Sequence, residues 1–345
     1  HAVYDYLLYE LAHLLGIKTF MFYPTSVSDR LLSFSDFWKG SDALHKEIER
    51  NQHKNFSVED LSPDIQEFYK IQTDPACDST PRDIKNYKKR SAPKKVVAIK
   101  AKLILQSIRD FSVFKKFFFF LGKVFGDNIK REYFSVQKSA DFDKKFIYVP
   151  LNYQPENTTS PLAGVFVDLI LMIEILSASI PDDWVIYVKE HPTQWFTHGL
   201  NFFDSRYKGY YKKIAGLKNV KIVPVETDTY TLINKSQAVA TATGTAALEA
   251  VFRSKPSMVF GYPWFRDCEG IFRVNSTEQC RQIIQKIING FKIDQQRLIN
   301  YLKALDDTTI HGFIDKAYVD EDADEQENMK NLTNAVLREV ERICP

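Results

Sequence analysis

The chain has 345 residues and a formal net charge of +2, with 44% hydrophobic and 26% charged residues. These values are typical of a soluble globular protein of about two domains, and the near-neutral balance indicates no particular partner. The four cysteines (Cys77, Cys268, Cys280 and Cys344) form no CxxC spacing. Their wide separation argues against a structural zinc site or a disulfide scaffold and favours a reducing cytoplasm.

The first elements predicted are a helix and a strand. Apolar residues recur at helical spacing over 1–15, Gly16 ends the helix, and 18-KTFMFY-23 indicates a strand. A doubly wound domain has a strand before such a helix, so we expect the chain to begin inside a Rossmann-like domain with residues missing before His1. A long polar helical region is expected at about 35–72.

A basic stretch follows at 85–131, which contains 14 Lys and Arg but only two acidic residues, both Asp. One interpretation is a solvated helix face with a loop. The other is peripheral membrane contact, because interleaved Phe and Lys at 114–125 suit an interfacial helix facing anionic headgroups or a lipid-linked acceptor. No nucleic-acid-binding motif accompanies the charge, so nucleic acid is not an expected partner.

From residue 146 the pattern becomes regular. Strands are predicted at 146–151, 184–192, 220–225, 237–243 and 255–261, and helices at 165–180, 227–236 and 244–254. This alternation predicts parallel βαβ units, and therefore an α/β fold with a Rossmann-like domain. An acidic run at 320–327 precedes a last amphipathic helix at about 328–343. The predicted division is 1–145, 146–318 and 319–345.

Three polar loops follow predicted strands, at 152–160, 189–194 and 241–245. In open parallel sheets ligands bind at the carboxyl ends of the strands. In the third loop, Thr243-Gly244-Thr245 leads from a strand into a helix, which predicts an anion site with two hydroxyls. The alternative is an ordinary threonine N-cap with a packing glycine. Glu249, one turn further on, is either a ligand for a ribose hydroxyl or a solvent-facing glutamate.

The second loop places His191 before Pro192 at a strand end. An imidazole there can donate to a phosphate oxygen and stabilise charge on a leaving group, although a lone histidine is often structural. Lys189 and Glu190 precede it, and strand alternation turns one of them inward without indicating which. Lys189 is a candidate binding residue.

The first loop carries Glu156, flanked by Gln154 and Asn157, which are candidate binding residues. A carboxylate in a cleft acts as a general base or as a nucleophile, whereas a plain loop acid makes local turn hydrogen bonds. No His/Cys/Asp spacing indicates a metal site, and the Gly-x-Ser-x-Gly motif of serine hydrolases is absent.

Segments 149–164, 181–194, 241–251 and 255–265 together resemble bacterial capsule and surface-polysaccharide biosynthesis proteins, a group that includes the capsular Kdo transferases. The resemblance is strongest over about 146–275. It implies a GT-B fold of two Rossmann-like domains facing a cleft. It also implies a nucleotide-activated sugar held mainly by the C-terminal domain, usually a CMP-linked acidic sugar.

By the same resemblance, His191-Pro192 and Thr243-Gly244-Thr245 contact the donor phosphate. The segment Gln154-Pro155-Glu156 corresponds to a Gln followed by an acid, with Glu in place of the expected Asp. No metal and no cofactor besides the donor substrate is implied.

The expected function is a cytoplasmic glycosyltransferase of capsule or lipopolysaccharide synthesis, with peripheral contact at the inner face of the inner membrane. It would transfer Kdo or a nonulosonate from a CMP donor to a glycan or lipid-linked glycan acceptor. The alternatives are a CDP-polyol phosphotransferase, a UDP-sugar 2-epimerase of GT-B type, and a non-catalytic scaffold in a polysaccharide assembly complex.

Overall fold

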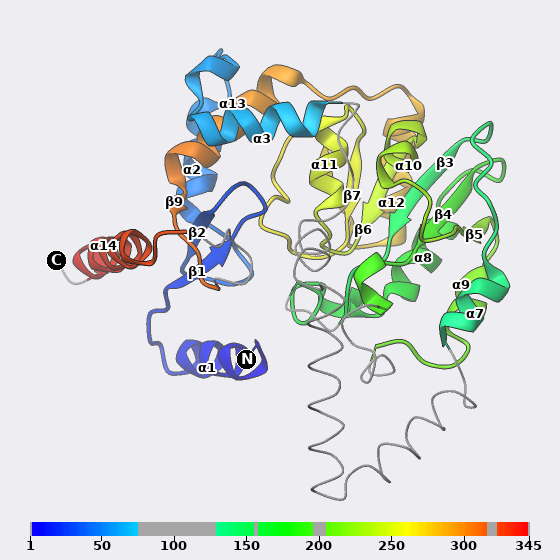
Figure 1. Ribbon diagram of the computed structural model, residues 1–345, viewed down its shortest axis with the longest axis horizontal. Coiled ribbons are helices and arrows are strands. Elements are labelled where there is room, and N and C mark those ends of the chain that lie inside the picture. Colours follow the sequence, from blue (N-terminus) through cyan, green and yellow to red (C-terminus); the bar gives the residue numbers. More distant parts are fainter. Residues whose placement is uncertain (1, 75–128, 155–157, 196–204, 316–322, 344–345) are drawn as a thin grey trace, which may run out of the picture.

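The computed structural model describes residues 2–74, 129–154, 158–195, 205–315 and 323–343 (Figure 1). The strands are β1 (Met21–Pro24), β2 (Arg30–Phe34), β3 (Phe146–Pro150), β4 (Val185–Lys189), β5 (Val220–Ile222), β6 (Ala238–Thr241), β7 (Ser257–Val259), β8 (Ile271–Arg273) and β9 (Ile310–His311). The α-helices are α1 (Ala2–Leu14), α2 (Asp42–Asn51), α3 (Pro63–Thr73), α7 (Ile129–Val136), α8 (Leu169–Ser177), α9 (Tyr210–Ala215), α10 (Thr229–Lys235), α11 (Ala246–Phe252), α12 (Thr277–Ile288), α13 (Gln295–Thr308) and α14 (Glu325–Ile343).

The C-terminal half is built on a six-stranded sheet in the order β5-β4-β3-β6-β7-β8. All neighbouring strands pair in parallel. The chain first winds outward from β3 to β5 and then returns to β6 on the other side of β3, which is the strand order of a Rossmann fold. The predicted α/β fold with a parallel Rossmann-like domain is confirmed. The point where the direction reverses lies between β3 and β6.

Both faces of this sheet are covered, as expected for parallel strands that are apolar on both sides. Ile147 and Val149 of β3 pack in a core with residues of α8, α9 and α12. The alternate residues, Phe146 and Tyr148, pack on the opposite face with residues of α10 and with Ala250 of α11. The sheet therefore fixes which side chain at each strand end faces which layer.

The described N-terminal residues form a different sheet. Strands β1 and β2 are antiparallel, and the third strand is β9 (Figure 1). Within the described residues, then, a Rossmann-like sheet is seen in the C-terminal half. The polar region expected at 35–72 consists of two separate helices, because Ser41 caps α2 and Pro63 occupies the first turn of α3.

A buried arginine ties the N-terminal elements to α13. Arg30 on β2 is 2% exposed. Its Nε lies 2.6 Å from Asp64 Oδ2, and its Nη2 lies 3.0 Å from Asp306 Oδ1. Helix α13 also packs against α2, so a helix of the expected 146–318 domain contacts the N-terminal elements. The exact domain boundaries remain a prediction.

The last helix, α14, begins three residues before its predicted start. None of the helices in the described residues is long and apolar enough to cross a membrane. Most of the basic stretch lies outside the described residues, so peripheral membrane contact through it remains a prediction. Its last residues enter α7, where Ile129 and Tyr133 pack into the core beneath the parallel sheet.

Candidate functional site

The loops that follow β3 and β6 are joined by Asn152, at the point where the strand order reverses. Its Nδ2 donates to Thr243 Oγ1 at 3.0 Å, and its Oδ1 accepts from Thr241 Oγ1 at 3.0 Å. The backbone N–H of Gly244 donates to Thr241 Oγ1 at 3.2 Å. Asn152, Thr241 and Thr243 are all buried. This bonding fixes two of the three predicted loops side by side at the crevice where Rossmann-like sheets bind ligands.

In the turn Thr243-Gly244-Thr245, the first two residues have structural roles and the third is exposed. Thr243 Oγ1 donates to the carbonyl of Thr158 at 2.5 Å, so its only proton is used on the loop after β3. A Cβ on Gly244 would lie 2.9 Å from Thr241 Oγ1, so the glycine is required for the close approach. Thr245 precedes the short helix α11 and is exposed. The exposed group that the turn offers a ligand is therefore Thr245, and its predicted phosphate contact remains a prediction.

Glu249 lies half-buried on α11, with Thr245 Oγ1 3.4 Å from its Oε1. Burial raises the pKa of its carboxyl group, against the opposing effects of Thr245, Arg253 and Lys189. The carboxylate therefore lies within electrostatic range of Lys189 and is not a plain solvent-facing group. Its contact with a ribose hydroxyl remains a prediction.

Both residues before His191 are buried, on opposite faces of the sheet. Lys189, 4% exposed, donates from Nζ to the Thr227 carbonyl and to Thr229 Oγ1, both at 2.7 Å. Burial lowers the pKa of this amine to about 8, although three nearby carboxylates oppose that shift. In this conformation Lys189 anchors the end of β4 to the first turn of α10.

Glu190 is fully buried and forms an ion pair with fully buried Arg206. The Arg206 Nε lies 2.8 Å from Glu190 Oε2, and Nη2 lies 3.1 Å from Oε1. Tyr211 also donates to Oε2, at 2.5 Å. Burial alone would lower the pKa of Arg206, but the Glu190 carboxylate together with Tyr210 and Tyr211 outweighs it, and the pKa is raised. Arg206 is therefore a permanent buried cation with a bidentate partner.

The same arginine joins the loops after β3 and β4. It donates to Gln154 Oε1 and to the Asn152 carbonyl, the latter at 3.0 Å. Gln194 accepts from the Gln154 N–H at 3.0 Å and donates to the Gln154 carbonyl at 2.8 Å. Gln154, predicted as a ligand-binding residue, thus holds the first loop to the second. Its own contact with a ligand remains a prediction.

His191 is held by its backbone in this network. Its N–H donates to Glu190 Oε1 at 2.8 Å, and its carbonyl accepts from Gln194 N–H at 3.0 Å. Its ring lies 5.7 Å from the ring of Tyr153, between centroids. Pro192 begins a 3₁₀ turn at Pro192–Trp195, where a missing N–H and a fixed φ are tolerated. The residue as a whole is half-buried.

Two of the predicted site residues, Glu156 and Asn157, lie outside the described residues. Sequence reasoning did not predict Arg206 or Gln194 as parts of the site. Gln194 is the last residue of the polar loop 189–194, which was a usable signal. Arg206 lies well beyond β4, in a segment that mixes aromatic and polar residues, and the sequence pattern does not mark it as buried. Among the described residues, no group of three or more His, Cys, Asp or Glu could hold a metal ion.

Comparisons with solved structures give remote similarities. A β-Kdo 2,7-transferase, KpsC of Thermosulfurimonas dismutans, matches 92% of this chain and 78% of its own at 12% identity and a TM-score of 0.40. The UDP-GlcNAc 2-epimerase of Methanocaldococcus jannaschii matches 51% of this chain and 47% of its own, at 14% identity and a TM-score of 0.32. Alr3699/HepE of Anabaena, in complex with UDP-glucose, matches 48% and 44%, at 15% identity and a TM-score of 0.29. The chain thus spans less than half the length of the last two proteins.

No protein of curated function matches the chain in sequence. One family model does match, that of the capsule polysaccharide biosynthesis proteins, over residues 158–287. These residues run from the loop after β3 into α12 and include β4, the Glu190–Arg206 pair and the Thr243-Gly244-Thr245 turn. The match covers 130 of the 345 residues, and it agrees with the resemblance drawn from the strand-end motifs within that segment.

Proposed function

We propose that this protein is a glycosyltransferase of surface-polysaccharide synthesis that uses a nucleotide-activated sugar. The observation that carries the proposal is the reversal of strand order between β3 and β6, beside which three polar loops begin, inside the segment that matches capsule biosynthesis proteins or directly before it. Ligands of Rossmann-like sheets bind at such a reversal. The donor we propose is CMP-linked, carrying an acidic sugar such as Kdo or a nonulosonate, and the acceptor is a glycan or a lipid-linked glycan.

The chemistry assigned to the site is a displacement at the anomeric carbon. An acceptor hydroxyl oxygen forms the new bond while the bond from that carbon to the phosphate oxygen breaks, either directly or through a glycosyl intermediate on Glu156. In the direct case Glu156 takes the hydroxyl proton. His191 donates a hydrogen bond to the departing phosphate, which spreads its developing charge. The Thr245 hydroxyl donates to the same phosphate, and Gly244 permits its close approach to the turn.

The fixed backbone of His191 supports this assignment. Both its N–H and its carbonyl are hydrogen-bonded to buried partners, so the imidazole starts from a defined position at the loop. A catalytic donor that is already oriented loses less entropy on binding the transition state.

Nucleotide binding is the first test. Melting temperatures are measured for the full chain with CMP, CDP, UDP and GDP, and then for His191→Ala and Thr245→Ala. A ligand at 100 times its Kd should stabilise the fold by about 2.7 kcal/mol. We expect stabilisation by CMP, reduced in both variants and retained in His53→Ala, an exposed histidine outside the crevice.

The outcomes separate the remaining alternatives. Preference for UDP would replace the CMP donor with a UDP donor. Conversion of a free sugar nucleotide without an acceptor would then indicate an epimerase. Release of CMP from a CDP-polyol with transfer of the polyol phosphate would indicate the phosphotransferase. No response to any nucleotide would contradict the enzymatic proposal and favour the scaffold.

A further inference from the structure

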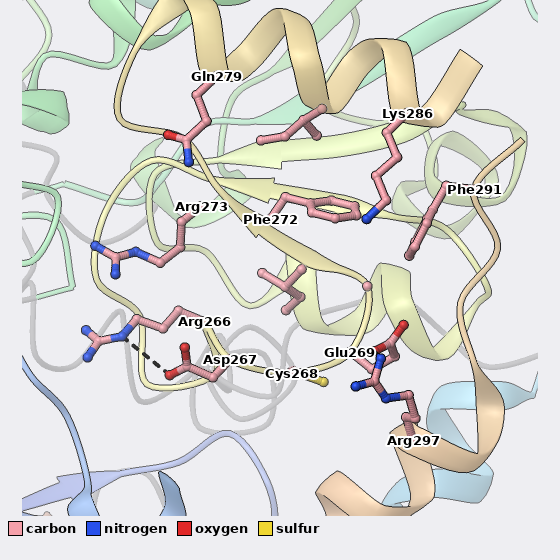
Figure 2. Close-up of a pocket in the computed structure, with 13 residues that line it drawn as sticks. Arg266, Asp267, Cys268, Glu269, Phe272, Arg273, Gln279, Lys286, Phe291 and Arg297 are labelled. Carbon is pink, nitrogen blue, oxygen red and sulfur yellow. Dashed lines mark ion pairs between the residues drawn. The ribbon is translucent and has the colours of Figure 1, made fainter. Parts of the chain in front are cut away.

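A cavity lies along the outer edge of the parallel sheet at β8, two strands away from β6. Its volume is about 530 Å³. Figure 2 shows its lining side chains, which come from the loop before β8, from β8 itself, from α12, from the connection after α12 and from the start of α13. Its charged lining residues are Arg266, Asp267, Glu269, Arg273, Lys286 and Arg297.

The cations of this cavity outnumber its anions by four to two. Each carboxylate already has a partner: Asp267 Oδ2 lies 3.6 Å from Arg266 Nε, and Glu269 Oε2 lies 3.4 Å from Arg297 Nη1. Two cations remain. Within the part of the chain that the structure describes, neither Arg273 nor Lys286 forms an ion pair with a carboxylate. The lining therefore carries an uncompensated positive charge that favours an anion.

Arg273 is the most informative of these cations. It is the last residue of β8, so it lies at the carboxyl edge of the sheet. Its guanidinium carbon lies 5.0 Å from the centroid of the Tyr262 ring, and its Nε is buried with no hydrogen-bond partner among the residues that the structure describes. Buried donors are nearly always hydrogen-bonded in native proteins, so the unbonded Nε of Arg273 is unusual. The side chain is positioned by its packing on Tyr262 and not by hydrogen bonds from this nitrogen.

Two further groups converge on Arg273. Gln279 accepts from the Asn275 N–H at 2.8 Å with its side-chain oxygen, which leaves its amide nitrogen as a donor. Figure 2 shows that nitrogen on the side facing Arg273, and it shows Arg266 extending in the same direction as Arg273. Burial lowers the pKa of Arg266, and the nearby charge of Arg273 lowers it further, while Asp267 opposes both. An anion between the two guanidinium groups would relieve this repulsion.

The position connects the cavity to the proposed donor turn. Tyr262, under the Arg273 guanidinium, donates its N–H to the Leu162 carbonyl at 2.9 Å. The preceding Gly261 lies so close that a Cβ there would be 2.6 Å from Thr243 Cγ2. Arg273 is therefore linked through Tyr262 and Gly261 to the turn assigned to the donor phosphate.

We propose that the cavity at β8 binds the anionic group of a sugar, with Arg273 and the Gln279 amide as its hydrogen-bond donors and Arg266 as a second positive charge. The ligand class is a sugar acid or a sugar phosphate, both of which present planar or tetrahedral oxygens to a guanidinium fork. The site itself rests on the cavity and its charges. That the anionic sugar is a substrate of the transferase rests on the proposed function.

The test is a calorimetric titration of the full chain with glucuronate, glucose 6-phosphate, inorganic phosphate and neutral glucose, with no nucleotide present. We expect binding of one or both acidic sugars and none of glucose. Arg273→Ala should weaken that binding by about tenfold or more, as expected for loss of a charged hydrogen-bond donor. Arg281→Ala is the matched control, because Arg281 lies on α12 beside Gln279 but is exposed and paired with Glu278.

Two results would overturn the site: no binding of either acidic sugar, or equal affinity in Arg273→Ala and wild type. Arg273→Lys keeps the positive charge but lacks the two parallel donors of the guanidinium group, so it should also bind acidic sugars more weakly than wild type. It serves as the test variant if Arg273→Ala fails to fold. If glucuronate binds with the higher affinity, the site prefers a carboxylate. If glucose 6-phosphate does, it prefers a phosphate. If acidic sugars bind while nucleotides do not, the transferase proposal fails and the anion site stands.

Discussion

Replacing Arg206 with Met should destabilise the protein strongly. Both Arg206 and Glu190 have fully buried side chains, and two donors of the guanidinium contact the carboxylate at 2.8 and 3.1 Å. Arg206→Met removes these bonds and those to Gln154 and to the Asn152 carbonyl, and it leaves the Glu190 carboxylate buried without its counter-ion. Breaking one side of a buried ion pair costs about 3–5 kcal/mol.

The free energy of unfolding is measured by urea titration with circular dichroism and linear extrapolation. Wild type, Arg206→Met, Glu190→Gln and the double variant form a double-mutant cycle. Because the double variant leaves no unpaired buried charge, it should be more stable than the sum of the two single losses predicts. Lys218→Ala is the control. Its amine lies 2.7 Å from Asp182, but both side chains are largely exposed, so no measurable loss is expected.

If Arg206→Met cost no more than Lys218→Ala, the loops after β3 and β4 could not depend on this pair. Additive losses in the cycle would likewise refute the coupling between Arg206 and Glu190. In both cases the argument that the pair positions His191 would be wrong.

Three further perturbations follow from the structure. Burial lowers the pKa of Lys189 from 10.5 to about 8, so between these pH values the unfolded chain binds more protons than the folded chain. The free energy of unfolding should therefore rise by roughly 3 kcal/mol from pH 8 to pH 10.5. Urea titrations of Lys189→Met should lack this rise. A Cβ at Gly261 would lie 2.6 Å from the Leu162 carbonyl oxygen, so Gly261→Ala should lower the melting temperature and weaken nucleotide binding; an unchanged melting temperature would contradict the close packing of that edge. Arg30→Met should cost about 3–5 kcal/mol, because it leaves the carboxylates of Asp64 and Asp306 without their buried counter-ion; a loss below 1 kcal/mol in urea titration would show that β2 and α13 are not joined through this arginine.

The parallel half of the fold was predictable because its strands are buried on both faces. The runs 146-FIYVPL-151 and 184-WVIYVK-189 are continuously apolar up to the strand end, and the structure places β3 and β4 there. The N-terminal sheet was not predictable in the same way. Its third strand, β9, has two residues and pairs with β2 from about 280 positions away. Local periodicity carries no information about such a distant pairing.

The sequence predicted where the polar residues of the candidate site lie better than it predicted what each of them binds. The sequence indicated that polar groups gather at strand ends, and Asn152, Lys189 and Thr243 do lie there. It did not indicate that Thr243 donates to Thr158 or that Lys189 donates to Thr227 and Thr229. Hydroxyl and amine donors at a crevice suit both a ligand and a neighbouring loop, and only the three-dimensional packing decides between them.

The end of β4 shows why buried polar groups matter next to the proposed catalytic histidine. Lys189 is bonded to α10 on one face of the sheet, and Glu190 is bonded to Arg206 and Tyr211 on the other. The strand end is thus held from both sides directly before His191, and a shift of the His191 backbone would break bonds in both layers. A hydrophobic residue at either position would fill the space without fixing a direction. We therefore attribute the two buried charges to the orientation of the loop, and the cycle on Glu190 and Arg206 tests this attribution when the CMP affinity of each folded variant is measured beside its stability.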